Sequence, residues 1–291
     1  MFKFRIQPKI LEIKGVKIGG FPFNPPVMIG TIFYHKHKIV FEPRKGEFNK
    51  EAAQTLIKSQ EELSDVTKIP ALIDVAAETI EAMIKYIDFV AEHTNNPFLV
   101  DVPSKEVMEA AIKHVNEVGL LNRVIINSLT PKAKDEELKL LQEYKVKNVV
   151  LLLYTSRIMD VNARVNELNT MLQRIEAIGI TTPLVDTFVI DIPSLAASMR
   201  TIIYVKANLG LPAGCGAHNA VSSMRKQFKK RYGIEGLEAA ELTSNIAPII
   251  LGADFVLYGP IEAYKRVLPA AYAVYTSYKY LSRKPENLLE L

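Results

Sequence analysis

Short apolar runs alternate with amphipathic stretches along the whole chain, and this alternation limits the folds that it can adopt. The runs are rich in Val, Ile and Leu and are bounded by Pro, Asn, Lys or Arg, as expected for parallel strands buried on both faces beneath helices. Between the runs, apolar residues recur at helical spacing, for example at Ile80, Met83 and Ile87. We expect eight strands, at residues 27–33, 71–75, 98–102, 124–126, 149–153, 183–190, 211–215 and 254–258.

The expected helices cover residues 50–67, 79–93, 105–118, 135–144, 161–178, 194–208, 220–231 and 237–251. Ser104 and Ser194 are placed like N-caps of two of them. Eight strand–helix units in 291 residues predict a TIM-type (β/α)8 barrel, an α/β fold that forms a single domain over residues 1–291, with closing helices in residues 262–291. An open doubly wound sheet is the alternative, but it normally has a Gly-rich first turn, and Ile29-Gly30-Thr31 does not match G-x-G-x-x-G.

The charge and the cysteine content narrow the classes of partner. The chain has 36 Lys and Arg against 32 Asp and Glu, a net charge of +4, so nucleic acid is not expected as a partner. The densest basic run, residues 225–231, could meet an anionic ligand tail or an acidic partner. Cys215 alone cannot form an internal disulfide or a multi-cysteine metal site, which fits a reducing, intracellular home. No segment approaches the about 18 apolar residues of a membrane span, so we expect a cytoplasmic chain without its own anchor.

Polar side chains recur where the expected strands end. They are Asp74, Asp101 and Asn127 after consecutive strands, Asp186 and Asp191 at the sixth strand, and Asn219 after the seventh. The loops at the carboxyl ends of the strands form the functional face of such a barrel. A single Asp after a strand is often only a helix cap, yet the recurrence favours a site. Carboxylates and carboxamides suit a neutral, flat heterocycle with several N–H donors, such as a reduced pterin, better than a phosphate, so we predict that these six residues bind the substrate.

Little in the sequence supports a metal site or a nucleophile. His35 and His37 would lie on one side of an extended segment, but no nearby carboxylate or cysteine completes a familiar ligand spacing. We therefore expect a surface or loop role for both and no metal. Ser128 and Ser156 have no sign of a paired base, and Cys215 is interpreted as a small buried hydrophobe.

Longer strings of residues are more specific than any single Asp or Asn. They lie at residues 16–20, 28–34, 37–40, 60–65, 81–90, 211–220 and 252–262. Through these strings nearly the whole chain resembles the H-subunit family of tetrahydromethanopterin S-methyltransferase. The resemblance implies transfer of a methyl group between N5 of methyl-tetrahydromethanopterin, or methyl-tetrahydrofolate, and the Co(I) of a corrinoid (cobalamin) on a partner protein, as in the one-carbon metabolism of methanogenesis. It also implies no cofactor bound by the chain itself, a homodimer, and a peripheral place at the cytoplasmic face of a membrane-bound methyltransferase complex.

More distantly, the chain resembles the pterin-binding barrels, which include corrinoid-linked methyltetrahydrofolate methyltransferases and dihydropteroate synthases. This resemblance implies that Asp101, Asn127 and either Asp186 or Asp191 hold the pterin, and that Asn219 meets its N5 region. Asp186 and Asp191 are an odd number of residues apart, so only one of them can face the pocket from a regular strand, and we prefer Asp191. A tertiary amine leaves poorly unless it is protonated or hydrogen-bonded, which assigns catalysis to Asn219, with a water and Asp101.

Two departures from the family pattern bear on the substrate. Residues 154–160 stand where the family has a loop with Asn, Asp and Pro, and Val102-Pro103-Ser104 stands in place of a Ser-Thr pair. The first departure leaves the type of pterin open.

Two other functions can be weighed against methyl transfer. A dihydropteroate-synthase-like condensation would need a pyrophosphate loop rich in Arg, Lys and Ser and a Lys near Asn219, and neither is evident. A non-catalytic scaffold that docks onto a corrinoid protein or a membrane component would not need the polar residues that follow the strands.

Overall fold

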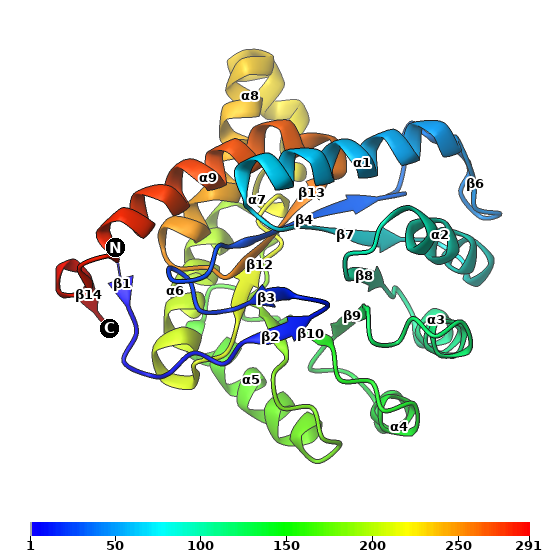
Figure 1. Cartoon of the computed structure of the whole chain (residues 1–291), viewed down its shortest axis with the longest axis horizontal. Helices are drawn as coiled ribbons and strands as arrows, with labels where there is room; N and C mark the ends of the chain where they lie inside the picture. The colour runs from blue at the N-terminus through cyan, green and yellow to red at the C-terminus, as the bar shows by residue number, and fades with distance from the viewer. Residues whose placement is uncertain (1) are drawn as a thin grey trace.

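The computed structural model describes residues 2–291, and eight parallel strands in it close into a barrel. The last of these strands pairs with the first, which completes the ring (Figure 1). In chain order they are β4 (Val27–Ile32), β7 (Ala71–Ala76), β8 (Phe98–Asp101), β9 (Val124–Leu129), β10 (Val149–Leu152), β11 (Leu184–Asp186), β12 (Ala213–Cys215) and β13 (Phe255–Pro260). The predicted TIM-type barrel is confirmed, and each predicted strand overlaps one of these.

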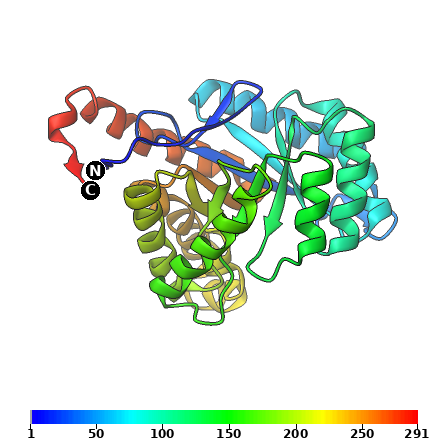
Figure 2. The same cartoon turned by 90° about the horizontal axis from the view of Figure 1, so that it is seen from below.

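Helices cover the outside of the barrel (Figures 1 and 2). They are α1 (Lys50–Thr67), α2 (Ile80–His93), α3 (Lys105–Glu117), α4 (Asp135–Glu143), α5 (Val161–Glu176), α6 (Ile192–Leu209), α7 (Asn219–Ser222), α8 (Arg225–Ile250) and α9 (Tyr264–Leu281). Alternate strand residues, such as Ile73, Val100 and Ile126, face these helices in one continuous apolar core. Within residues 2–291, none of these helices is long and apolar enough to cross a membrane.

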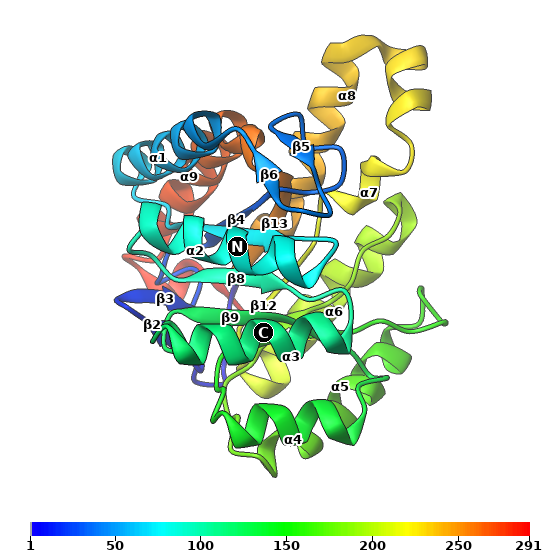
Figure 3. The ribbon, with the colours of Figure 1, turned by 90° about the vertical axis from the view of Figure 1, so that its right-hand side faces the viewer.

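The seventh and eighth helical segments differ from the prediction. We predicted helices at 220–231 and 237–251, but α7 is a single turn and α8 runs from Arg225 to Ile250 with a break inside it. The break is at Gly233, whose φ of 72° and ψ of −176° are not helical and are readily adopted only by glycine. The first part of α8 stands away from the other helices in two views (Figures 1 and 3).

Short strands outside the barrel complete the chain. β2 (Leu11–Ile13) and β3 (Val16–Ile18) form an antiparallel hairpin, and β5 (Val40–Glu42) pairs with β6 (Glu47–Phe48) after β4. β1 (Phe2–Lys3) pairs with β14 (Leu289–Glu290), so the two ends of the chain meet. The segment predicted to hold closing helices, residues 262–291, begins within the 3₁₀ turn η1 (Ile261–Ala263) and contains α9, the 3₁₀ turn η2 (Pro285–Asn287) and β14.

The amino ends of the barrel strands are closed by apolar packing and by one buried ion pair. Ile13 and Ile18 of the β2–β3 hairpin pack against the inward-facing residues of the barrel. Nearby, the Asp254 carboxylate accepts hydrogen bonds from the backbone N–H groups of Phe21 (2.9 Å) and Ala213 (3.1 Å) and lies 2.5 Å from Lys206 Nζ. A ligand can therefore reach the barrel interior only from the carboxyl ends of the strands.

Candidate functional site

The two-residue period of the strands stacks polar side chains on an apolar layer inside the barrel. The apolar layer includes Leu72, Leu99, Ile125 and Leu184. Because side chains alternate across a strand, the residue two positions later points the same way, one level nearer the carboxyl end. Those residues are Asp74, Asp101, Asn127 and Asp186. We call these four residues the floor, since all of them line the same cavity.

Hydrogen bonds between strands fix one side of the floor. Asn127 Nδ2 donates to Asp74 Oδ1 at 3.1 Å, and Thr31 Oγ1 donates to Asp74 Oδ2 at 3.2 Å. The amide of Asn127 is thereby oriented, which leaves its Oδ1 to accept from a ligand. Asp101 pairs in register with Asn127, and within residues 2–291 its carboxyl accepts no hydrogen bond. Asp101 is therefore available to a bound molecule.

Burial shifts the protonation of the floor carboxyls. It raises the pKa of Asp74 to about 6, while the hydrogen bonds from Asn127 and Thr31 lower it. Burial, and then the neighbouring Asp74 carboxylate, raise the pKa of Asp101 to about 8. With a pKa of about 8, Asp101 is largely protonated at neutral pH and can donate a proton.

The opposite side of the floor joins Asp186 to the loop after β12. Asp186 Oδ1 accepts a hydrogen bond from the backbone N–H of Phe188 at 2.8 Å. Burial raises the pKa of Asp186 to about 6, while the hydrogen bonds from the backbone of Phe188 and Gly216 lower it. A side chain at Gly216 would begin 3.2 Å from Asn219 Nδ2 and 3.8 Å from Asp186 Oδ2. Gly216 thus keeps open the space between the carboxylate and the amide, where a flat ring could lie.

The preference for Asp191 over Asp186 is wrong. Asp191 is the N-cap of α6, where its Oδ1 accepts the backbone N–H of Ser194 at 2.8 Å, and it does not line the cavity. β11 ends at Asp186, and Phe188 has a φ of 64°, so the strand is not regular through both Asp residues as we assumed. Ser194 was expected to be the N-cap of α6, but it lies three residues after the actual N-cap, Asp191. Ser104 is the N-cap of α3, as predicted.

The cavity has a volume of about 1060 Å³ and brings the other predicted residues together. Asp74, Asp101, Asn127, Asp186 and Asn219 all line it, although they are far apart in the sequence. Its volume lies slightly above the roughly 300–1,000 Å³ that ligand pockets occupy. The cavity can therefore hold a fused ring and part of a tail.

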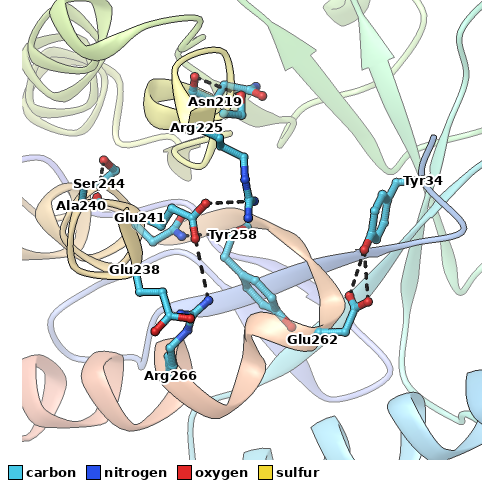
Figure 4. Close-up of polar contacts among 12 residues, drawn as sticks. Tyr34, Asn219, Arg225, Glu238, Ala240, Glu241, Ser244, Tyr258, Glu262 and Arg266 are labelled. Atoms are coloured by element: carbon cyan, nitrogen blue, oxygen red, sulfur yellow. Dashed lines mark hydrogen bonds and ion pairs between the residues drawn. The ribbon is translucent and has the colours of Figure 1, made fainter. Parts of the chain in front are cut away.

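Ion pairs and hydrogen bonds organise the walls above the floor (Figure 4). Tyr34 OH donates to Glu262 at 3.1 Å, and Arg225 Nη1 lies 2.9 Å from Glu241 Oε1. Arg266 bridges Glu238 at 2.8 Å and Glu241 at 3.8 Å, which ties α9 to α8. Only Arg225 of the basic run at 225–231 lines the cavity, and the remaining Lys and Arg of the run are exposed beyond it.

His35, His37 and Cys215 lie in different surroundings. His35 is exposed and lies 2.9 Å from Glu78, whereas His37 is buried in the loop after β4. Cys215 is buried, as predicted, and burial raises the pKa of its thiol. Among residues 2–291, no group of three or more His, Cys, Asp or Glu side chains is arranged to hold a metal ion.

Sequence reasoning missed the wall residues. Thr31 ends the first strand region and Glu262 follows the eighth, so the rule that found Asp101 could also have found them. Glu241 and Arg266 lie within helices, where nothing in the sequence marks the turn that faces the cavity.

Comparison with known proteins gives a consistent match over the whole chain. Residues 6–290 match the family described as "Tetrahydromethanopterin S-methyltransferase MtrH subunit". The H subunit of this methyltransferase from Methanopyrus kandleri is 38% identical over 284 residues, which cover 90% of this chain and 88% of that protein. Its counterpart from Methanosarcina acetivorans is 36% identical over 285 residues, covering 93% and 90% respectively.

Solved structures of similar shape come from another group of barrels. The dihydropteroate synthase of Vibrio fischeri superposes with a TM-score of 0.68 over 93% of this chain and 98% of that one, at 15% identity. The Xanthomonas albilineans dihydropteroate synthase gives a TM-score of 0.63 over 95% and 99%, at 19% identity. At these identities the likeness shows the fold alone.

Proposed function

This chain belongs to the MtrH family of tetrahydromethanopterin S-methyltransferase subunits, and on that premise we propose that it transfers a methyl group between N5 of methyl-tetrahydromethanopterin and the Co(I) of a corrinoid on a separate protein. The observation that carries this proposal is the convergence of Asp101, Asn127, Asp186 and Asn219 on one cavity. The floor binds the reduced pterin ring, and the corrinoid-carrying partner covers the mouth.

The floor suits the donor-rich edge of a pterin. A carboxylate can accept two parallel N–H bonds from an amino-pyrimidinone edge, and Asp186, with a pKa of about 6, is mainly ionised at neutral pH. Its bond from Phe188 N–H holds the carboxylate in place before the ring binds. Asn127, oriented by Asp74, offers its Oδ1 as a second acceptor.

Methyl transfer needs little covalent chemistry from the barrel. Co(I) is the nucleophile, so the chain must align the methyl donor and stabilise the leaving amine. As the N5–methyl bond breaks, its electron pair stays on N5, which must then gain a proton. Asn219 donates a hydrogen bond at N5, and Asp101, largely protonated at neutral pH, supplies the proton directly or through a water.

The closed lower end of the barrel supports this arrangement. Since Ile13 and Ile18 block the amino ends of the strands, methyl donor and acceptor must share one mouth. The ring must bind first and deepest, with N5 toward the mouth. The relatives are named as subunits of a methyltransferase, and we propose that this chain too works with partner subunits, as a homodimer at the cytoplasmic face of a membrane complex.

A methyl-transfer assay with free Co(I) cobalamin tests the reaction without any partner protein. We expect loss of the Co(I) absorbance with methyl-tetrahydromethanopterin, and slower or no loss with methyl-tetrahydrofolate. A faster reaction with the folate would make methyl-tetrahydrofolate the methyl donor, in keeping with the departure from the family pattern at residues 154–160. Failure with both donors, by protein that is folded, would overturn the proposed reaction.

A further inference from the structure

The cavity is acidic at its floor and basic at its mouth. Three of the four floor residues are Asp. The ionisable side chains that line the cavity above the floor are Tyr34, His35, Lys36, Lys38, His218, Arg225, Glu241, Tyr258, Glu262 and Arg266. The Lys and Arg in this set outnumber the Glu, so the upper cavity would attract an anion, unlike the floor.

The carboxylates of the upper cavity are already engaged. Glu241 pairs with Arg225 at 2.9 Å and contacts Arg266 at 3.8 Å. Glu262 accepts hydrogen bonds from Tyr34 OH and His37 Nε2, both at 3.1 Å. By contrast, within residues 2–291 no carboxylate lies within 4.0 Å of the amino groups of Lys36 and Lys38. These two lysines are therefore the unmatched cations of the mouth.

The loop that carries Lys36 and Lys38 is held in place. Between them lies His37, whose ring is buried and whose Nδ1 accepts the backbone N–H of Phe33 at 3.0 Å. Nε2 therefore carries the ring proton and donates a hydrogen bond to Glu262 Oε1, and the ring stacks on Tyr34 with centroids 4.2 Å apart. With His37 anchored inward, the exposed lysines on either side are presented by a preorganised turn, which lowers the entropy lost on binding.

We propose that Lys36 and Lys38 bind the anionic tail of the methyl donor. This inference rests on the proposed function, because it takes the pterin ring to lie on the floor with N5 toward the mouth. In a tetrahydropterin the tail leaves the ring at the carbon next to N5, so it must run toward the same mouth. The ligand class is a tetrahydropterin whose tail ends in carboxylate or phosphate groups, and each lysine offers a compact charge with three donors to such a group.

The test pairs a double variant with a matched control. Lys36→Gln with Lys38→Gln removes both charges and leaves at each position a polar side chain that is one atom shorter. Lys145→Gln with Lys147→Gln is the control, because those lysines have the same spacing, are also exposed and precede β10 at the opposite end of the barrel. The assay is methyl transfer to free Co(I) cobalamin with two forms of one donor, with and without the anionic end of the tail. The pair is whole and truncated methyl-tetrahydromethanopterin or, where the folate is the active donor, methyl-tetrahydrofolate triglutamate and methyl-tetrahydropteroate.

We expect the KM of the Lys36/Lys38 variant for the whole donor to rise about tenfold, with kcat unchanged, and the effect to shrink as salt is added. The KM for the truncated donor should stay near that of the wild type. Lys36→Arg with Lys38→Arg should restore the KM, since the charge returns.

The outcomes separate this inference from the function beneath it. If the wild type uses neither donor form, the proposed function fails. If the wild type is active and the double Gln variant matches the Lys145/Lys147 control with the whole donor, the tail site is wrong and the function stands. An equal rise of KM for whole and truncated donors would mean that the lysines support the loop rather than bind the tail.

Discussion

The two ends of the barrel bury carboxyl groups in opposite ways. At the amino end, Asp254 is 1% exposed, pairs with Lys206 and accepts two backbone N–H groups. At the carboxyl end, Asp74 and Asp186 are 3% and 5% exposed, yet within residues 2–291 no Lys or Arg nitrogen lies within 4.0 Å of either. The same residue type has a directly paired cation at one end and none at the other.

This contrast separates a structural carboxylate from a binding one. Burying a charged group costs free energy unless partners replace its water, and Asp254 has those partners. Asp74 and Asp186 accept hydrogen bonds but have no Lys or Arg within 4.0 Å, and Asp101 accepts no hydrogen bond within residues 2–291. Burial raises the pKa values of all three. Unmatched acceptors in a cavity indicate that the missing partners belong to a ligand.

The largest expected effect is on stability and comes from breaking the amino-end pair. Lys206→Met should lower the free energy of unfolding by about 3–5 kcal/mol, because the Asp254 charge would stay buried without its cation. Urea denaturation followed by circular dichroism measures the loss, with Lys145→Met as an exposed control. A loss below about 1 kcal/mol would mean that the two backbone N–H groups alone satisfy Asp254.

At the other end, the next largest effect should be on catalysis. Asn219→Ala should lower kcat for methyl transfer about 100-fold, since the hydrogen bond to the leaving N5 is lost, while pterin binding changes little. Rapid-mixing kinetics with Co(I) cobalamin gives kcat, and calorimetric titration gives the Kd of the pterin. Ser223→Ala, just after the same helical turn, controls for disturbance of α7. Equal losses of kcat and affinity would reassign Asn219 to binding.

The sequence predicts the floor better than the walls, and the reason is periodicity. Asp74, Asp101 and Asn127 follow apolar runs whose ends are visible, and strand alternation then fixes which way they point. The sixth run, 183–190, looks like a long strand with Asp186 inside it and Asp191 just after it, and the pattern does not decide which of the two faces the pocket. Its early end depends on the turn at Phe188, held by a side-chain bond to Asp186 that no periodic pattern encodes.

The walls depend on how helices pack, which is a long-range property. Glu241 reaches the cavity because α8 resumes after Gly233 and returns along the barrel, and Arg266 reaches Glu238 and Glu241 from α9. Spacing within one helix cannot reveal a contact that another helix completes. The eight-strand barrel itself was predictable because it repeats one strand–helix unit whose apolar pattern recurs along the chain.

The Asp186 and Asp191 pair sharpens the contrast within one end of the barrel. Asp186→Asn should raise the Kd of the pterin about 20-fold, because a charge-assisted acceptor becomes a neutral amide, and should not lower stability. Asp191→Ala should leave the Kd unchanged and lower the free energy of unfolding by about 1 kcal/mol through loss of the α6 N-cap. Pterin titration and urea denaturation of both variants check this, and the reverse result would restore Asp191 as the binding residue.

The last expected effect is the pH dependence caused by Asp101. Its pKa is about 8 in the folded protein and near 3.9 in an unfolded chain, so the folded state binds the proton more tightly. Between these values the folded state holds more protons, so its stability falls as pH rises from about 4 to about 8 and then levels off. Asp101→Asn removes this loss, so its free energy of unfolding should exceed that of the wild type at pH 8, by a difference that grows as pH rises from about 4 to about 8.

The rate of methyl transfer should also depend on the protonation of Asp101, and this dependence can be distinguished from an effect on stability. If Asp101 supplies the proton to N5, the rate of methyl transfer by the wild type should fall above about pH 8. The Asp101→Asn variant should be slower at every pH, and its rate should not show this fall. The equivalent change at the amino end, Asp254→Asn, should lower stability and leave the pH profile of kcat unaltered, because Asp101 and the other floor carboxyls remain. A wild-type profile that is flat through pH 8, with Asp101→Asn as active as the wild type, would show that the proton comes from another source and would leave Asp101 as a binding group only.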